Sequence, residues 1–396
     1  MRTPYDLPLS GVTIVDFTQV MLGPCCTQVL GDYGADVIKI ERPGVGDLSR
    51  TSIVDHLGPN NPVFLSLNRN KRSVALDVRS AEGKQVVYDL VRDADVVVNN
   101  FRPGVMQRLG FGYDDLRAVN PRIIWAFGSG FGSSGPYAHK GGQDVIAQAY
   151  SGVMRRKADP HHPLAIYATA LADYSAGMHL VQGILLALLH RERTGTGQRV
   201  EVSLYNSMLA IQMQESTMAL MRDRELNWAA MPLTGVFDTA DSALVLVGAF
   251  KANPLRDICA ALDLPDLSEQ ERFSDLAHLF DHRDEIQQIL RERFAADTTE
   301  HWLARLEEQD LLCAPVRGIG EALADPQTAH NGMVIEFDHP TGEKVRTVGS
   351  PISLSDVQAE VRHAPPLLGE HGRAVLAELG YTAQRIDELV AAGVVA

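Results

Sequence analysis

Short runs rich in β-branched residues alternate with helix-length stretches over the first third of the chain. The runs are VTIVDF (12–17), DVIKIE (36–41), SVALDV (73–78), DVVVNN (95–100) and RIIWAFGSG (122–130). Strands that alternate with helices are typical of βαβ units, in which successive strands are parallel. The pattern therefore predicts an α/β fold built on a mostly parallel sheet.

The residues that directly follow these runs are the first candidates for a binding site. In open α/β sheets, ligands bind outside the carboxyl ends of the strands. The candidates are residues 18–21, Arg42, Arg79, residues 100–102 and residues 128–132. We expect them to meet at one edge of the sheet.

The rest of the chain indicates a second domain. Residues 144–225 read as helical, and GVFDTADSALVLVGAF (235–250) predicts a hairpin with its turn near Asp241 and Ser242. Because 396 residues exceed what one hydrophobic core usually serves, two domains are expected. We predict a large domain of residues 1–225 and 330–396, and a smaller α+β domain of residues 226–329.

Charge is distributed unevenly along the chain. The formal net charge is −14, which argues against binding nucleic acid or an acidic membrane through the field of the whole protein. Between Lys39 and Arg108, however, eleven Lys and Arg stand against eight Asp and Glu. This local excess either serves an anionic ligand or is chance variation on a solvated face. The same two interpretations, phosphate binding or a solvated turn, apply to LNRNKRSVALD (67–77).

Several kinds of site have no support in the sequence. The four cysteines lack metal or disulfide spacing and no H-E-x-x-H motif occurs, so we predict no metal site. No G-x-S-x-G motif points to a serine nucleophile. The N-terminus lacks the apolar core of a signal peptide, and the apolar region 164–189 contains Asp173, His179 and Gln182. We therefore expect a cytoplasmic protein without a membrane span.

The stretch GSGFGSSGP (128–136) is rich in glycine. Its backbone amides are able to cradle a phosphate or an oxyanion. The spacing of the known nucleotide-binding motifs is absent, so a tight loop after a strand is the favoured interpretation.

Asp173 lies between an apolar run (164–172) and a helix-like stretch. One interpretation is that its oxygen caps the helix by accepting backbone N–H bonds. The other is that a carboxylate at the edge of an apolar pocket attacks an activated carbonyl and becomes acylated. The residues alone favour capping, because most helices need a cap.

Taken together, these segments resemble the family III CoA-transferases, also called the CaiB/BaiF family. The likeness spans nearly the whole chain. It is carried by VDFTQVMLGPCCTQVLGDYGADVIKIERPGVGD (15–47), NRNKRSVALD (68–77), NFRPGVMQRLG (100–110), GFGSSGPY (130–137), LADYSAGMHLVQGILLAL (171–188), GTGQRVEVSLYNS (195–207), ALADPQ (322–327) and APPLLGEH (364–371).

The resemblance implies a fold and a chemistry. The fold is a Rossmann-like large domain that binds coenzyme A, with a smaller α+β domain, in a homodimer of two interlocked ring-like chains. Asp173 falls on the catalytic aspartate of the family. The implied reaction moves CoA from an acyl-CoA donor to a free carboxylic acid, through an aspartyl anhydride and an aspartyl-CoA thioester.

The resemblance also implies which residues contact the substrate. The positions for coenzyme A are Val20, Leu22, Arg42, Leu76, Arg79, Asn100, Phe101 and Arg108, with Lys140 one residue out of register. Among them, the arginines are natural partners for the nucleotide phosphates.

The acyl pocket departs from that of the formyl-CoA:oxalate members of the family. Gln19 and Met21 stand where those members have His and Gln, and Gln143 and Asp144 replace a Tyr–Glu pair. We expect a different pair of acids and a less polar acyl pocket.

Two alternatives remain open. A 2-methylacyl-CoA racemase on the same fold shares Asp173, but its catalytic His lies in a GHD triplet where this chain reads GQD (142–144). Without that His, one of the two bases needed for proton exchange is missing. The third interpretation is a CoA-binding protein without catalysis, in which Asp173 is only a cap.

Overall fold

The computed structural model describes residues 7–52, 61–159 and 162–396. These residues form two compact units. The first unit consists of the described parts of Met1–Val153, Ile166–Ile211 and Gln327–Ala396, and the second of those of Met154–Ala165 and Gln212–Pro326.

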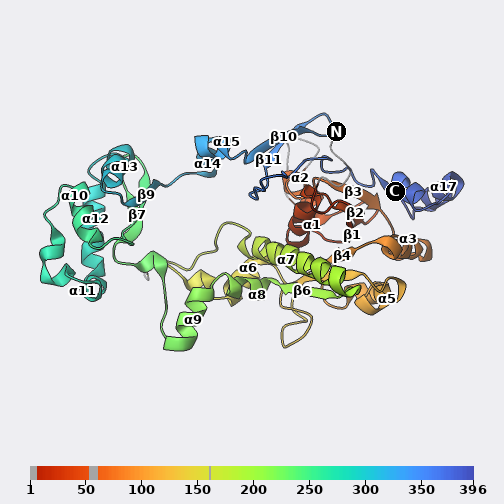
Figure 1. The fold of residues 1–396 in the computed structure, drawn as a ribbon, viewed down its shortest axis with the longest axis horizontal. Helices are drawn as coiled ribbons and strands as arrows, with labels where there is room; N and C mark the ends of the chain where they lie inside the picture. Colours follow the sequence, from red (N-terminus) through yellow and green to blue (C-terminus); the bar gives the residue numbers. More distant parts are fainter. Residues whose placement is uncertain (1–6, 53–60, 160–161) are drawn as a thin grey trace. The chain divides into compact units, whose positions relative to one another are not determined.

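A six-stranded parallel sheet forms the centre of the first unit (Figure 1). Its strands are β1 (Thr13–Asp16), β2 (Asp36–Glu41), β3 (Lys71–Ala75), β4 (Val96–Asn99), β5 (Ile124–Ser129) and β6 (Arg199–Ser203). Their order is β3-β2-β1-β4-β5-β6, and every neighbouring pair is parallel. The prediction of a parallel sheet is confirmed, with one strand on each predicted run. Strand β6 escaped prediction because its charged residues, Arg199 and Glu201, are exposed at the edge of the sheet.

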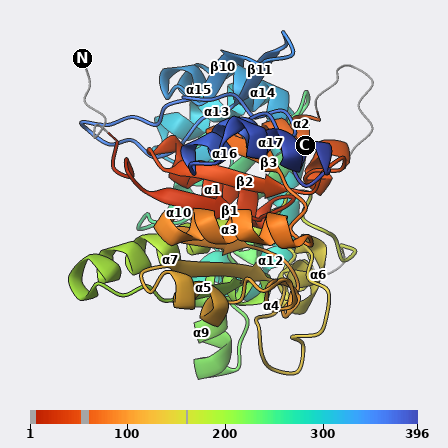
Figure 2. The ribbon, with the colours of Figure 1, turned by 90° about the vertical axis from the view of Figure 1, so that its right-hand side faces the viewer.

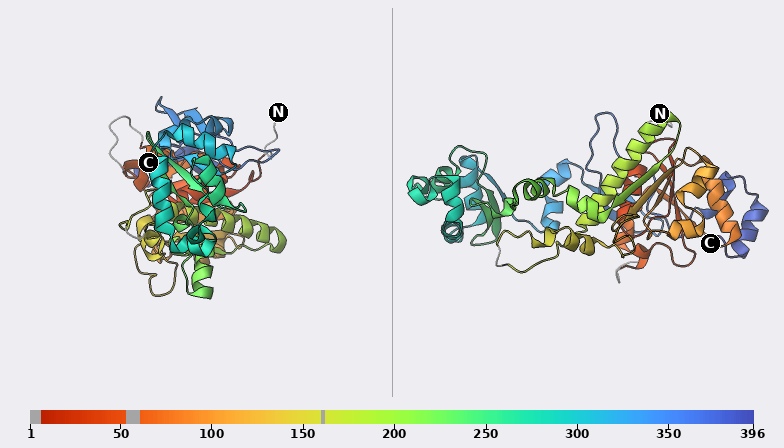
Figure 3. Two further views of the ribbon diagram at one scale, coloured as in Figure 1. Left: turned by 90° about the vertical axis from the view of Figure 1, so that its left-hand side faces the viewer. Right: turned by 90° about the horizontal axis from the view of Figure 1, so that it is seen from below.

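Helices cover both faces of this sheet. One face packs against α3 (Ala81–Asp93), α5 (Tyr113–Val119), α16 (Gly372–Glu378) and α17 (Ala383–Ala391) (Figure 2). The other face packs against α1 (Leu22–Asp32), α7 (Leu171–Thr194) and α8 (Leu204–Ala210). The right-hand view of Figure 3 shows the strands between these two layers. Shorter elements complete the unit: η1 (Leu48–Thr51), α2 (Pro62–Leu65), α4 (Val105–Leu109), α6 (Asp144–Tyr150), and the antiparallel pair β10 (Val334–Asp338) and β11 (Lys344–Val348).

Among the described helices, α7 is long and apolar enough to cross a membrane by length and composition. Its inner face, which includes Ala176, Leu180 and Ile184, is fully buried in the core of the sheet. The core helices of soluble proteins commonly have a similar length and composition.

The second unit contains both helices and a small antiparallel sheet. Its antiparallel sheet consists of β7 (Thr234–Asp238), β8 (Ala243–Val247) and β9 (Leu312–Pro315). In its core the Phe294 ring contacts Phe237 at a tilt and Trp302 edge-on. The helices are α9 (Met213–Arg222), η3 (Trp228–Ala230), α10 (Pro254–Ala261), η4 (Leu267–Glu269), η5 (Glu271–Phe273), α11 (Leu276–Asp281), α12 (Arg283–Phe294), α13 (Thr299–Glu308) and α14 (Ile319–Ala324).

The changeover between the units differs from the ranges expected from the sequence. The described residues of 154–165, and residues 212–225, belong to the second unit rather than to the first. Arg156 accounts for part of this, because it pairs with Glu215 and donates a hydrogen bond to the Leu226 carbonyl oxygen. The chain first passes from the first unit to the second at η2 (Val153–Arg155). It returns to the first unit for the last time at α15 (Pro326–His330).

Candidate active site

Asp173 is the third residue of α7 and does not cap it. The N-cap is Ala170, which has no side-chain oxygen to offer. Instead, Oδ2 of Asp144 accepts hydrogen bonds from the backbone N–H groups of Ala172 (2.7 Å) and Asp173 (3.0 Å). The first turn of a helix leaves such N–H groups without partners inside the helix. The capping interpretation of Asp173 is therefore wrong, because Asp144 supplies the cap and leaves the Asp173 carboxylate free.

Asp144 is itself held in place by Gln148, which the sequence analysis missed. Asp144 is the first residue of α6, and its Oδ1 accepts a hydrogen bond of 2.6 Å from Nε2 of Gln148. Oε1 of Gln148 in turn accepts from the backbone N–H of Tyr167 (3.0 Å). Because Asp144 and Gln148 are both buried, this network fixes the chain that leads into α7. The spacing of an acid and an amide four residues apart on a short helix was the available signal.

The Asp173 carboxylate lies in a poorly solvated place. Burial, and secondarily the charge of Asp144, raise the pKa of Asp173 to about 6. Throughout residues 7–52, 61–159 and 162–396, no group donates a hydrogen bond to this carboxylate. Near neutral pH the group is thus an ionised carboxylate with little stabilisation, which is the state of an effective nucleophile.

Helix α1 approaches α7 closely beside Asp173. One turn after Asp173, a Cβ on Gly177 would lie 2.2 Å from Sγ of Cys25 and 2.7 Å from the carbonyl oxygen of Leu22. Only glycine permits this approach. Burial and the charge of Asp173 raise the pKa of Cys25 to about 12, so its thiol remains protonated.

A pocket of about 280 Å³ lies at the carboxyl ends of the strands. It brings together five of the residues predicted from the sequence: Gln19, Arg42, Leu76, Arg79 and Phe101. Its other walls are mainly apolar and consist of Phe17, Ile40, Val78, Val105 and Leu109, with Glu41 and Asp77. Arg42 and Arg79 are exposed. The pocket therefore combines an apolar interior with two available guanidinium groups.

The pocket lies where the strand order reverses between β1 and β4. Here the side chain of Asn100 holds Gln19 from both sides: Oδ1 accepts from the Gln19 N–H (2.9 Å), and Nδ2 donates to the Gln19 carbonyl (2.7 Å). Such switch points are the usual ligand sites of open α/β sheets.

Five predicted CoA contacts lie outside the lining of this pocket, and one of them is Asn100, described above. Val20 is exposed beside it, and Arg108 is exposed on α4. Leu22 is buried against β5, where a Cβ on Gly128 would lie 2.3 Å from its Cδ2. Lys140 donates a hydrogen bond of 2.6 Å to Oη of Tyr150 and lies over the Tyr137 ring. The side chains of Leu22 and Lys140 are therefore already engaged within the protein.

Of the predicted acyl-pocket residues, one lines the pocket and three lie outside its lining. Met21 is the N-cap residue of α1 and Gln143 that of α6, and Oε1 of Gln143 accepts from the Val145 N–H (3.1 Å). Asp144 contacts the turn that carries Asp173, as described above, and Gln19 lines the pocket.

Five of the eleven cations between Lys39 and Arg108 form ion pairs with buried or partly buried carboxylates. The pairs are Lys39–Asp47 (2.8 Å), Arg50–Glu41 (2.7 Å), Arg69–Asp32 (2.6 Å), Lys71–Asp16 (3.4 Å) and Arg72–Asp36 (2.5 Å). Lys71 is fully buried, and burial lowers its pKa to about 8. Both interpretations of LNRNKRSVALD, phosphate binding and a solvated turn, are therefore wrong.

The glycine-rich loop after β5 has a structural explanation. A Cβ on Gly142 would lie 2.2 Å from Cα of Gly130, so the two backbones cross in contact. The N–H of Gly132 donates to Oγ of Ser129, and that of Ser133 to Glu201. These two amides are occupied and do not form an anion cradle. In the described ranges, no group of three His, Cys, Asp or Glu side chains is placed to hold a metal ion.

Comparison with known proteins decides the family. The profile of CoA-transferase family III matches residues 9–372. The chain belongs to this family. Succinyl-CoA:glutarate CoA-transferase of Homo sapiens is 34% identical, over 98% of this chain and 90% of the relative. Formyl-CoA:oxalate CoA-transferase of Escherichia coli O157:H7 is 35% identical, over 96% of this chain and 97% of the relative.

A solved structure shares the fold of this family III CoA-transferase. A CaiB/BaiF family protein from Brucella suis superposes with a TM-score of 0.83 at 31% identity, over 94% of this chain and 99% of that one. The resemblance read from the sequence motifs and the prediction of a CoA-transferase are confirmed. Enzymes of this class use CoA thioesters as substrates, which suits the pocket at the sheet edge.

Proposed function

We propose that this family III CoA-transferase moves CoA from an acyl-CoA to a free carboxylic acid, with Asp173 as the covalent nucleophile. The observation that carries the proposal is the Asp173 carboxylate itself, which lies on the first turn of α7 without a hydrogen-bond donor among the described residues. Its raised pKa reflects weak solvation, which favours attack on a thioester carbonyl.

The reaction has four steps. The Asp173 carboxylate attacks the thioester carbonyl of the donor, so that the C–S bond breaks and an aspartyl anhydride and CoA thiolate form. The thiolate attacks the aspartyl carbonyl, which releases the donor acid and leaves an aspartyl-CoA thioester. The acceptor carboxylate attacks this thioester, giving a second anhydride and the thiolate. The thiolate then attacks the acceptor carbonyl, which forms the new acyl-CoA and regenerates Asp173.

One thioester replaces another in this sequence, so no ATP is consumed. The protein supplies positioning, which is a large part of catalysis between bound groups. The apolar pocket fits the adenine ring, and Arg42 and Arg79 suit the nucleotide phosphates. Val20, Asn100 and Phe101 complete this side of the proposed CoA site, with Arg108 nearby on α4.

The racemase alternative is less well supported by the geometry. A racemase needs a second base facing the α-carbon. Gln143 stands at the relevant position, and its amide is used to cap α6. An amide does not take up a proton near neutral pH, so Gln143 cannot replace that base.

A transfer assay tests the proposal. The purified protein is incubated with succinyl-CoA and glutarate, and then with a wider panel of acyl-CoAs and acids, and new acyl-CoA is measured by mass spectrometry. Transfer that is lost in Asp173→Ala supports the proposal. No transfer, together with deuterium exchange at the α-carbon of a 2-methylacyl-CoA, would instead establish the racemase.

We also propose a homodimer. Leu185, Leu186 and Leu189 are exposed on the outer side of α7, as expected for a helix covered by a second copy of the chain. Sedimentation velocity of the purified protein tests this, and a monomer at all concentrations would contradict it.

A further inference from the structure

Val20 has a backbone conformation that its side chain disfavours. Its φ is +67°, in the left-handed region that a β-branched residue rarely adopts. Val20 joins β1 to α1 beside Gln19, which lines the pocket at the sheet edge. Strain of this kind persists only where the surrounding structure imposes it.

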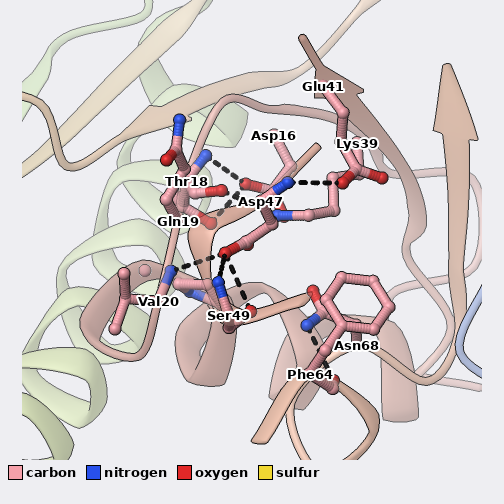
Figure 4. A network of polar contacts seen from close by, with 12 residues as sticks. Asp16, Thr18, Gln19, Val20, Lys39, Glu41, Asp47, Ser49, Phe64 and Asn68 are labelled. Carbon is pink, nitrogen blue, oxygen red and sulfur yellow. Dashed lines mark hydrogen bonds and ion pairs between the residues drawn. The ribbon is translucent and has the colours of Figure 1, made fainter. Parts of the chain in front are cut away.

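Three consecutive residues of this turn are each held by a different polar side chain, two of which, Lys39 and Asp47, are labelled in Figure 4. The Thr18 carbonyl accepts a hydrogen bond of 2.7 Å from Nζ of Lys39. Gln19 is bracketed by Asn100, as described above. The Val20 N–H donates to Oδ1 of Asp47 at 3.0 Å.

Asp47 is the centre of this arrangement. Its carboxylate is paired with Lys39 at 2.8 Å, and neither side chain is exposed to solvent. Oδ1 also accepts from the N–H and the hydroxyl of Ser49, both at 2.8 Å. Burial alone would raise the pKa of Asp47, but the charge of Lys39 and these hydrogen bonds lower it to about 2. Asp47 is therefore a charged and rigid anchor beneath the turn.

Stability alone does not explain a buried ion pair at this place. Removing two charges from water costs as much as their attraction often returns, and apolar residues of similar volume frequently serve as well. The pair of Asp47 and Lys39 also holds the strained turn at the wall of the pocket, so it fixes the shape of that wall as well as contributing to stability.

We propose that Asp47 and Lys39 are positioning residues that impose the left-handed conformation of Val20 and thereby shape the CoA pocket. Asp47 acts on the Val20 N–H, and Lys39 orients Asp47 while holding the Thr18 carbonyl. This inference rests on the proposed function, because it concerns the binding of CoA at that pocket. Neither residue contacts the ligand in this account.

The test compares CoA binding by wild type and Asp47→Ala in calorimetric titrations, with coenzyme A itself as the probe. The matched control is Asp32→Ala, which removes a carboxylate buried in the same unit. Among the described residues, the Asp32 carboxylate pairs with Arg69 and accepts from Asn70, and it makes no hydrogen bond to residues 18–21. Without Asp47 the turn is free to leave the strained conformation, and binding of CoA would have to restore it. We therefore expect Asp47→Ala to weaken CoA binding about tenfold, which corresponds to the cost of one strained residue. Asp32→Ala should bind CoA like wild type even if it melts at a lower temperature.

A second substitution separates positioning from general damage. Glycine adopts positive φ without strain, so Val20→Gly should keep the turn in shape without Asp47. The loss on Asp47→Ala should thus be much smaller in the Val20→Gly background. If the alanine variant does not fold, Asp47→Asn, which keeps an oxygen opposite the Val20 N–H, should show the same pattern with a smaller loss.

The outcomes are distinguishable. Wild type that does not bind CoA would refute the proposed function. If wild type binds CoA, two results would overturn the positioning role and leave the proposed function intact. One is that Asp47→Ala binds CoA as well as wild type. The other is that Asp47→Ala loses as much affinity in the Val20→Gly background as it does alone. An equal loss of affinity in Asp32→Ala would also overturn it, because the effect would then follow from any buried ion pair.

Discussion

The carboxylate of Asp144 caps the helix turn that carries Asp173, through hydrogen bonds to the backbone N–H groups of Ala172 and Asp173. Two carboxylates therefore lie at one helix N-terminus, and only that of Asp144 accepts hydrogen bonds from its N–H groups. This arrangement separates capping from catalysis. One carboxylate fixes the backbone, and the other remains available to react.

Asp144→Asn should change the pH dependence of transfer. The side chain keeps an oxygen for the two N–H groups but loses the charge that contributes to the raised pKa of Asp173. Transfer needs ionised Asp173, so its rate in wild type should fall as the pH drops through about 6. In Asp144→Asn this acid limb should move to lower pH, while in the exposed control Asp114→Asn it should stay in place. Unchanged limbs in both variants would show that Asp144 has no electrostatic effect on the nucleophile.

Asp173→Asn should stabilise the protein at neutral pH. In the folded protein the pKa of Asp173 is raised from 3.8 to about 6, because burial disfavours the charged carboxylate. The neutral form therefore contributes stability that is fully present below pH 3.8 and is lost as the pH rises through 6. The amide never becomes charged, and at pH 8 the variant should gain up to about 3 kcal/mol in unfolding free energy. Denaturant unfolding at pH 8 and pH 4 measures this. A variant that is less stable at pH 8, or a difference that does not shrink toward pH 4, would contradict the assigned environment.

Arg42→Met and Arg79→Met should each weaken the use of full-length acyl-CoA. Exposed guanidinium groups that meet phosphates should contribute about three- to tenfold in kcat/KM, and less at high salt. A pantetheine thioester lacks the nucleotide, so its kcat/KM should not respond to these substitutions. Arg117→Met, at an exposed position on α5, serves as the control. Equal losses on both substrates would place these arginines away from the phosphates.

Much of the fold was predictable because it follows from local patterns. The β-branched runs gave β1 to β5, and the hairpin around Asp241 was placed correctly. The strand-end rule brought Gln19, Arg42 and Arg79 to one pocket. Strand β6 was missed because an exposed edge strand needs no apolar run.

The charge network was not predictable, because sequence does not tell which charges meet in space. Lys71 and Asp16 lie far apart along the chain, yet both are fully buried and paired. From the sequence, a site for an anionic ligand was one of the two interpretations of the segment that contains Lys71. Similarly, the cap of α7 comes from Asp144 on another helix, so no motif at the start of α7 itself announces it.

In the proposed reaction, Asp173 becomes covalently attached first to the acyl group and then to CoA. The direct measurement is peptide mass spectrometry of the protein quenched during turnover with an acyl-CoA, in wild type and in Asp173→Asn. We predict an acyl or CoA adduct on the peptide that contains Asp173, removable by hydroxylamine and absent from the variant. Turnover without any adduct on that peptide, or the same adduct in Asp173→Asn, would contradict it.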